Sequence, residues 1–275
     1  MNTNKKLMAT LAGILSVGFL HAECGFKLPE LSLDTSCRFD TEYVYRGAKL
    51  NQQVFSPKIE ISTSLFDEGD IYFGNKAFLG VKDSRFAKYD YYLGASYEFA
   101  DIFAVDAGLI HHKYRNRFSW VKSLPRRDVK RHGEEIYLGF IADVFLNPSV
   151  YYSYDITQKR HNLEGKANYL YDLSSVGANG FAVDLFTKIG YDKTKRPLGL
   201  KSALRSGSVF DGFKKGYFYY GAGADIIVYI LRESVKIQTG ARYEGANAKK
   251  IWTAKLSEKN HKNFIWFSTS VECNF

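Results

Sequence analysis

A strict alternation of apolar and polar residues constrains this chain most, and it recurs in segments of about ten residues from Cys37 to the last residue. In the first segment Phe39 and Tyr43 fall on one face, while Asp40 and Glu42 fall on the other. Successive side chains of a β-strand point to opposite faces, so this period of two predicts strands. The pattern can be drawn about twelve times, and we therefore predict an all-β chain.

The expected strands are separated by connections of two kinds. We expect strands at residues 37–46, 58–65, 71–80, 90–99, 103–112, 135–144, 149–156, 163–172, 181–192, 217–228, 235–244 and 265–275. Connections after the even-numbered strands are short, whereas those after the first, fifth, ninth and eleventh are mostly long, above all 113–134, 192–215 and 245–263. This asymmetry is typical of a closed antiparallel transmembrane β-barrel, here of about 12 strands. Nothing in a two-sheet sandwich requires short and long connections to alternate in this way.

The N-terminus indicates export. Two lysines precede an apolar stretch from Leu7 to Leu20, and a short polar segment then ends in Ala22. This is the three-part pattern of a secretory signal peptide, and the stretch is shorter than the roughly 20 apolar residues of a membrane-spanning helix. We therefore expect a cleaved signal peptide at 1–22, a barrel at 23–275 and a location in the bacterial outer membrane.

The C-terminus carries a second signal. The last alternating segment ends in Phe275. It resembles the terminal aromatic strand that marks clients of the outer-membrane assembly machinery. We expect Phe275 to act as an assembly signal and that machinery to be a partner.

The polar face of each strand would line the lumen of such a barrel. The pore-lining candidates on that face are Arg38, Glu42, Arg46, Lys58, Glu60, Lys166, Lys188, Lys236 and Arg242. A barrel of this size is intermediate between eight-strand barrels filled by side chains and sixteen-strand barrels with open channels. These charges therefore either line a narrow pore or pair across the lumen and close it.

Glycines on the same face favour the open alternative, because they leave space in the lumen. They are Gly94, Gly108, Gly139, Gly221 and Gly223. We therefore expect passive diffusion of small hydrophilic solutes. A non-conducting structural or adhesin-like barrel is the alternative.

The long loops are basic. Their cations include Lys113, Arg126, Arg127, Lys195, Arg196, Lys249 and Lys250. Two roles remain open, namely attraction of anionic solutes to the mouth and binding of lipopolysaccharide phosphates. Outer-membrane lipid, lipopolysaccharide and small solutes are the expected partners, and nucleic acid is not, because an exported protein does not meet it.

An outer-membrane enzyme is the least favoured class. Its nucleophile would need an adjacent base, often a His and a Ser two residues apart on a strand. The histidines after the signal peptide have no serine at that spacing, and they are His111, His112, His132, His161 and His261. The sequence has no metal-ligand spacing or phosphate-binding loop, so we expect no cofactor.

The chain has three cysteines, Cys24, Cys37 and Cys273. The last two lie near the ends of the first and last strands, which are neighbours if the barrel closes. Export permits a disulfide between these two, or between Cys24 and either one, and the remaining thiol could link to an envelope partner. Three reduced thiols are the alternative.

Segment 41–47, Thr-Glu-Tyr-Val-Tyr-Arg-Gly, resembles the opening strand of the TorF family of outer-membrane porins, in which an aromatic-x-x-Arg-Gly pattern ends strand one. The tyrosine-rich segment 149–155 is similar to the middle region of that family. The resemblance covers about the first half of the chain, and the long basic loops depart from it. It implies a small porin and no established substrate.

Overall fold

The computed structural model describes residues 31–66, 68–82, 86–100, 102–114, 132–194, 216–231, 234–247 and 263–275. The expected signal peptide, Cys24 and most of the basic loop residues lie outside these ranges.

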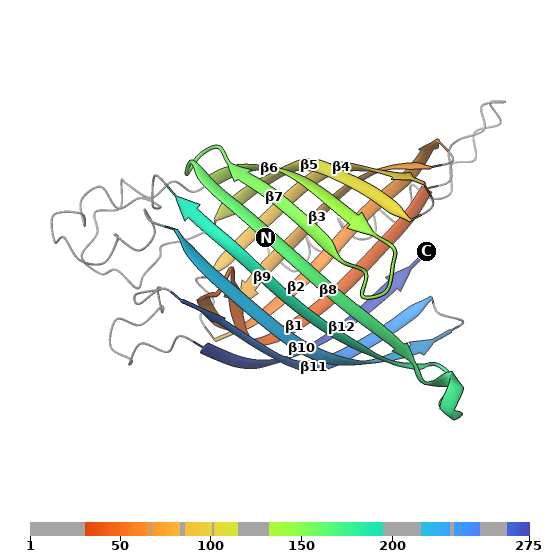
Figure 1. Cartoon of the computed structure of the whole chain (residues 1–275). Coiled ribbons are helices and arrows are strands. Elements are labelled where there is room, and N and C mark those ends of the chain that lie inside the picture. The colour runs from red at the N-terminus through yellow and green to blue at the C-terminus, as the bar shows by residue number, and fades with distance from the viewer. Residues whose placement is uncertain are drawn as a thin grey trace, which may run out of the picture.

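Twelve antiparallel strands form a closed barrel (Figure 1). Strands adjacent in sequence pair with each other, and β1 closes the ring by pairing with β12 from Asp34–Asn274 to Asp40–Ser268. The strands are β1 (Leu31–Tyr45), β2 (Ala48–Phe66), β3 (Gly69–Gly80), β4 (Ala87–Phe99), β5 (Phe103–Tyr114), β6 (His132–Ala142), β7 (Ser149–Asp155), β8 (Arg160–Asp172), β9 (Phe181–Thr194), β10 (Tyr217–Ile230), β11 (Val235–Ala246) and β12 (Asn263–Asn274). The predicted fold class is confirmed.

A short 3-10 helix, Leu173–Val176, follows β8, and the Asp172 side chain caps it by accepting a hydrogen bond from the backbone N–H of Ser174 at 2.8 Å. Within the described ranges, no helix has the length and apolar character needed to cross a membrane.

The outer surface of the barrel is apolar. Leu93, Leu109, Leu138 and Ile189 point outward near the middle of β4, β5, β6 and β9, and they are 50% to 62% exposed. The inner surface is polar, with Asp225 on β10 only 1% exposed. This distribution is the reverse of a water-soluble fold, and it follows the predicted alternation.

The first hairpin differs from the prediction. β2 begins at Ala48 rather than at residue 58, and the connection expected to be long is the two-residue turn Arg46–Gly47. Both turn residues have positive φ, 52° and 72°, as in a type I′ turn. A bulge at Leu50 in β2 and a positive φ of 51° at Gln53 break the period of two, so this part of the sequence does not show the alternation of a strand.

The inward glycines do not leave the lumen empty. A Cβ atom at Gly94 would overlap the ring of Tyr72 and the hydroxyl of Tyr137, and one at Gly139 would overlap the ring of Tyr151. The other predicted glycines also lie under neighbouring side chains: Gly108, Gly221 and Gly223. The expected free space is therefore wrong, because inward aromatic and long polar side chains occupy it.

Candidate pore in the barrel lumen

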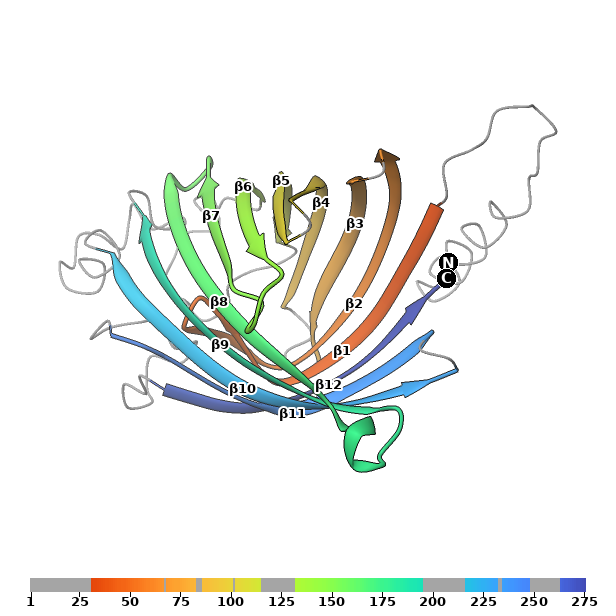
Figure 2. The same cartoon turned by 45° about the vertical axis from the view of Figure 1, so that its right-hand side comes forward.

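The end of the β1–β2 hairpin lies inside the barrel (Figure 2). β1 pairs with β12 as far as Asp40, and β2 pairs with β3 from Val54. Among the described residues, positions 42–52 have ladder partners within the hairpin and none in the neighbouring strands. The hairpin is therefore free to leave the wall and turn inward.

Arg46, at the turn, contacts the far wall and is 9% exposed. Its Nη2 atom donates to Glu135 Oε1 on β6 and to Ser153 Oγ on β7, both at 2.9 Å. Its Nη1 atom lies 3.7 Å from Asp192 Oδ2 on β9. Its carbonyl accepts a hydrogen bond of 3.0 Å from the Tyr217 hydroxyl on β10. Charge-assisted bonds of this kind are the stronger ones in proteins, so the turn is firmly held.

A chain of polar contacts leads from β4 to this arginine. Lys88 Nζ lies 2.8 Å from Asp90 Oδ2, and Asp90 Oδ1 lies 2.7 Å from His112 Nδ1. His112 Nε2 in turn lies 3.8 Å from Glu135 Oε2, the carboxylate that pairs with Arg46. The two carboxylates thus alternate with a lysine, an imidazole and an arginine along the lumen wall.

The ring of Tyr45 lies next to the turn and beside three cations. The Arg46 guanidinium carbon, Lys88 Nζ and the Arg160 guanidinium carbon lie 4.8, 4.9 and 5.7 Å from its centroid. Arg160 also donates from Nε to Asp192 at 2.8 Å. Cation–π contacts therefore add to the ion pairs that hold the hairpin.

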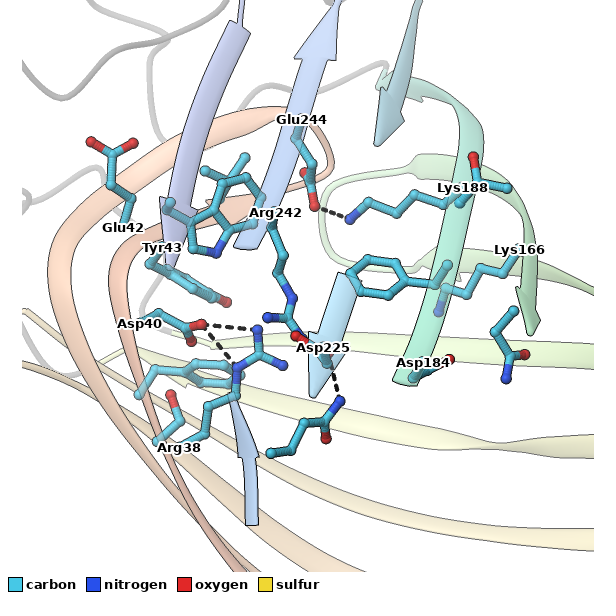
Figure 3. A pocket seen from close by; sticks show the side chains of 18 of the residues that line it. Arg38, Asp40, Glu42, Tyr43, Lys166, Asp184, Lys188, Asp225, Arg242 and Glu244 are labelled. Atoms are coloured by element: carbon cyan, nitrogen blue, oxygen red, sulfur yellow. Dashed lines mark hydrogen bonds and ion pairs between the residues drawn. The ribbon is translucent and has the colours of Figure 1, made fainter. Parts of the chain in front are cut away.

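A cavity of about 430 Å³, here called the charged cavity, opens in the lumen (Figure 3). Its charged lining residues are Arg38, Asp40, Glu42, Lys76, Lys166, Asp184, Lys188, Asp225, Arg242 and Glu244. Arg38 pairs with Asp40 at 2.9 Å, and Arg242 pairs with Asp225 at 2.6 Å. The pairing lowers the cost of keeping these charges away from bulk water.

A second cavity of about 380 Å³ adjoins the first. Its lining includes Arg46, Lys88, Asp90, His112, Glu135 and Ser153. Val44, Lys166 and Lys188 line both cavities, and we call these three residues the waist. Lys166 on β8 and Lys188 on β9 are direct partners in the strand register. Lys166 pairs with Glu164 at 3.0 Å and Lys188 pairs with Glu244.

Part of the lumen wall is built from tyrosines. The Tyr72 hydroxyl on β3 donates to Asp106 on β5 and contacts the Tyr137 hydroxyl on β6. The Tyr151 hydroxyl on β7 donates to the other oxygen of Asp106 at 3.1 Å. The inner faces of β3, β5, β6 and β7 therefore carry a cluster of tyrosine hydroxyls around Asp106.

The structure brings most of the predicted pore-lining residues to the cavities. Those that line the charged cavity are Arg38, Glu42, Lys166, Lys188 and Arg242, and Arg46 lines the second cavity. Three predicted residues, Lys58, Glu60 and Lys236, line neither cavity. Lys58 pairs with Glu60 at 3.1 Å, and Lys236 pairs with Glu272 at 3.2 Å.

The sequence did not single out the residues that contact the hairpin tip. These are Lys88, Arg160 and Asp192. The alternation does indicate that Lys88 faces the lumen, because it lies two residues before Asp90 and thus on the same face of β4. No spacing in the sequence relates these positions to Arg46.

Cys37 and Cys273 are both free thiols in this structure. The register pairs Cys37 with Val271 and Cys273 with Thr35, so the two cysteines are diagonal neighbours. Diagonal positions lie about 7–8 Å apart, which is beyond the usual Cα separation of a disulfide, about 4.4–6.8 Å. The seam disulfide that export would permit is therefore absent from this structure, in which both thiols are free.

Phe275 ends the chain on the outer surface. Its backbone exchanges hydrogen bonds of 3.0 and 3.1 Å with Leu33 on β1, and its side chain is 77% exposed. The terminal residue therefore takes part in the seam that closes the barrel.

No family model matches the chain, and no curated protein matches it. Among solved structures, the NanC porin is 8% identical with a TM-score of 0.49 and covers 88% of this chain and 98% of its own. LpxR from Salmonella typhimurium is 10% identical with a TM-score of 0.47, covering 88% and 99%. The KdgM porin is 10% identical with a TM-score of 0.45, covering 89% and 99%. These values do not assign the chain to a family, and the resemblance to the TorF family stays a prediction.

Proposed function

We propose that this protein is an outer-membrane porin that allows passive diffusion of small hydrophilic solutes. The observation that carries the proposal is the combination of an apolar exterior with a charged lumen that contains two adjoining cavities. The apolar outer face of the wall then contacts lipid, and the charged inner face contacts water.

The exterior supports residence in a membrane. Exposing apolar surface to water costs about 25 cal/mol per Å², and the outward side chains of successive strands form a continuous apolar surface of this kind. The signal peptide pattern at 1–22 and the terminal Phe275 support the outer membrane as the location. The same features support the assembly machinery, lipid and lipopolysaccharide as partners.

The cavities support small solutes. Volumes of about 430 and 380 Å³ lie within the range of about 300–1,000 Å³ that is typical of small-molecule sites. Their linings combine ion pairs with tyrosine and tryptophan rings. A polar solute can therefore exchange hydrogen bonds with the wall as it replaces water.

The waist supports a preference for anions. Like charges placed directly opposite each other on neighbouring strands are destabilising, yet Lys166 and Lys188 hold such positions where the cavities meet. An anionic group passing there would relieve their repulsion. The basic loops would add a longer-range attraction at the mouth.

A non-conducting structural or adhesin-like barrel is the second candidate. The contacts of Arg46 with β6, β7 and β9 favour it, because they place protein across the lumen. An enzyme has less support, since the His112 nitrogens face Asp90 and Glu135 rather than a nucleophilic hydroxyl.

Conductance decides between the two main candidates. Purified full-length mature protein, refolded into a planar bilayer, should give discrete current steps, whereas the same preparation unfolded by boiling should not. In a potassium chloride gradient the reversal potential should have the sign of chloride preference. Silence of the folded protein would remove the porin proposal, and a cation-selective current would remove the anion preference alone.

A further inference from the structure

The β1–β2 hairpin reaches across the barrel to the opposite wall. In the ring of twelve strands, β7 lies diametrically opposite β1. Arg46, which follows β1 directly, donates to Ser153 on β7 and to Glu135 on the adjacent β6. A contact between opposite walls of a barrel requires that one of them send a segment through the lumen.

The turn is shaped for its position. Gly47 has a φ of +72°, and a Cβ atom there would lie 2.7 Å from the Tyr219 Cβ atom and 3.1 Å from the Ala246 Cβ atom. Tyr217, Tyr219 and Ala246 form a buried cluster on β10 and β11. Glycine is therefore needed at this position both for the turn and for its close approach to the wall.

The hairpin also lies between the two cavities. Tyr43 and Val44 line the charged cavity, while Val44, Tyr45 and Arg46 line the second one. A solute that moves from one cavity to the other must pass the waist, one side of which is the hairpin residue Val44.

We propose that residues 43–47, docked in the lumen by Arg46, form the constriction that sets the permeability of this barrel. The inference rests on the proposed porin function, because a constriction has meaning for a lumen that conducts. The Arg46 guanidinium acts as a positioning group: it holds the hairpin by bridging carboxylates of β6 and β9. Loss of the bridge releases the hairpin and widens the path.

Single-channel conductance of matched variants tests this. Arg46→Gln should raise the unit conductance by about twofold or more, because the narrowest section of a pore limits its current. Glu135→Gln removes the partner on the wall and should have a similar effect. The double variant should conduct no better than either single one, since both changes break the same bridge.

Two controls separate docking from loss of charge. Lys236→Gln removes one inward cation from an ion pair that lines neither cavity, and it should leave the conductance close to that of the wild type. Arg46→Lys keeps the charge but not the two-pronged guanidinium, and it should give an intermediate conductance. A difference in gel migration between unheated and heated samples shows that each variant has folded.

The outcomes distinguish this inference from the porin proposal. A conducting wild type with an unchanged Arg46→Gln variant overturns the inference alone. A silent wild type with a conducting Arg46→Gln variant upholds the docked hairpin and overturns passive diffusion through the native protein. Silence of every folded variant overturns both.

Discussion

Lys166 on β8 lies directly opposite Lys188 on β9, and both residues line the two cavities of the lumen. Their partners, Glu164 and Glu244, flank them on the same charged wall. The two ammonium groups therefore lie where a solute passing between the cavities would meet them.

The double variant Lys166→Gln with Lys188→Gln should lose chloride preference, because Glu164 and Glu244 then face the waist without their counter-charges. The reversal potential in a potassium chloride gradient should move toward cation preference. The matched control is Lys58→Gln with Lys236→Gln, which removes the same charge away from the cavities. Equal shifts in the two double variants would mean that the lumen responds to its total charge and has no selective waist.

Gly139→Ala should destabilise the barrel, because a methyl group there meets the Tyr151 ring. Overpacking of this kind costs about 1–3 kcal/mol, measurable by urea titration of the protein in lipid vesicles. Gly165→Ala is the control, since its Cβ would come no closer than 3.9 Å to any neighbour. Equal stabilities of the two variants would contradict the packing of the Tyr151 ring over Gly139.

Thr35→Cys should create a disulfide with Cys273, because these positions are direct partners across the β1–β12 seam. Direct antiparallel partners lie about 4.5–5.5 Å apart, within disulfide range. Non-reducing gels of the oxidised variant should show a compact intrachain species that the wild type lacks. The same species in the wild type would mean that Cys37 and Cys273 are closer than the register allows.

Leu138→Arg should weaken folding in lipid, because Leu138 points outward in the middle of β6 and is 55% exposed. A charge on the lipid face at the bilayer midplane costs about 2–4 kcal/mol. Phe145→Arg is the control, since Phe145 lies in the connection after β6 and is 76% exposed. A folded protein that stays monomeric and soluble without detergent would contradict membrane residence altogether.

The sequence predicted the wall of this barrel well. Eleven strands were placed close to their observed positions, and most apolar faces were assigned correctly, as on β12, where Ile265 and Phe267 are exposed and Trp266 is buried. Tyr43 on β1 is an exception: it was expected on the apolar face with Phe39, but it is 7% exposed and lines the charged cavity, where its ring lies 4.9 Å from that of Phe78. Alternation is a local property, and for that reason a linear sequence records it.

The lumen was predicted less well. Arg46 was expected to face inward, but the hairpin that carries it across the barrel was read as a long loop. The glycines were taken as free space, although rings from adjacent strands cover them. Each of these features depends on which side chains of other strands meet a given position.

The sequence by itself determined the number of strands, their two faces and the closure of an even-numbered antiparallel ring, because a period of two needs no information beyond neighbouring residues. The contents of the lumen follow only from the three-dimensional arrangement of the strands. They are the hairpin held by Glu135 and Asp192, the pairing of inward charges and the waist between the cavities. The contacts of Arg46 with Glu135 and Ser153 join residues 89 and 107 positions apart. Their geometry exists only once the ring has closed and set the register of every strand against the others.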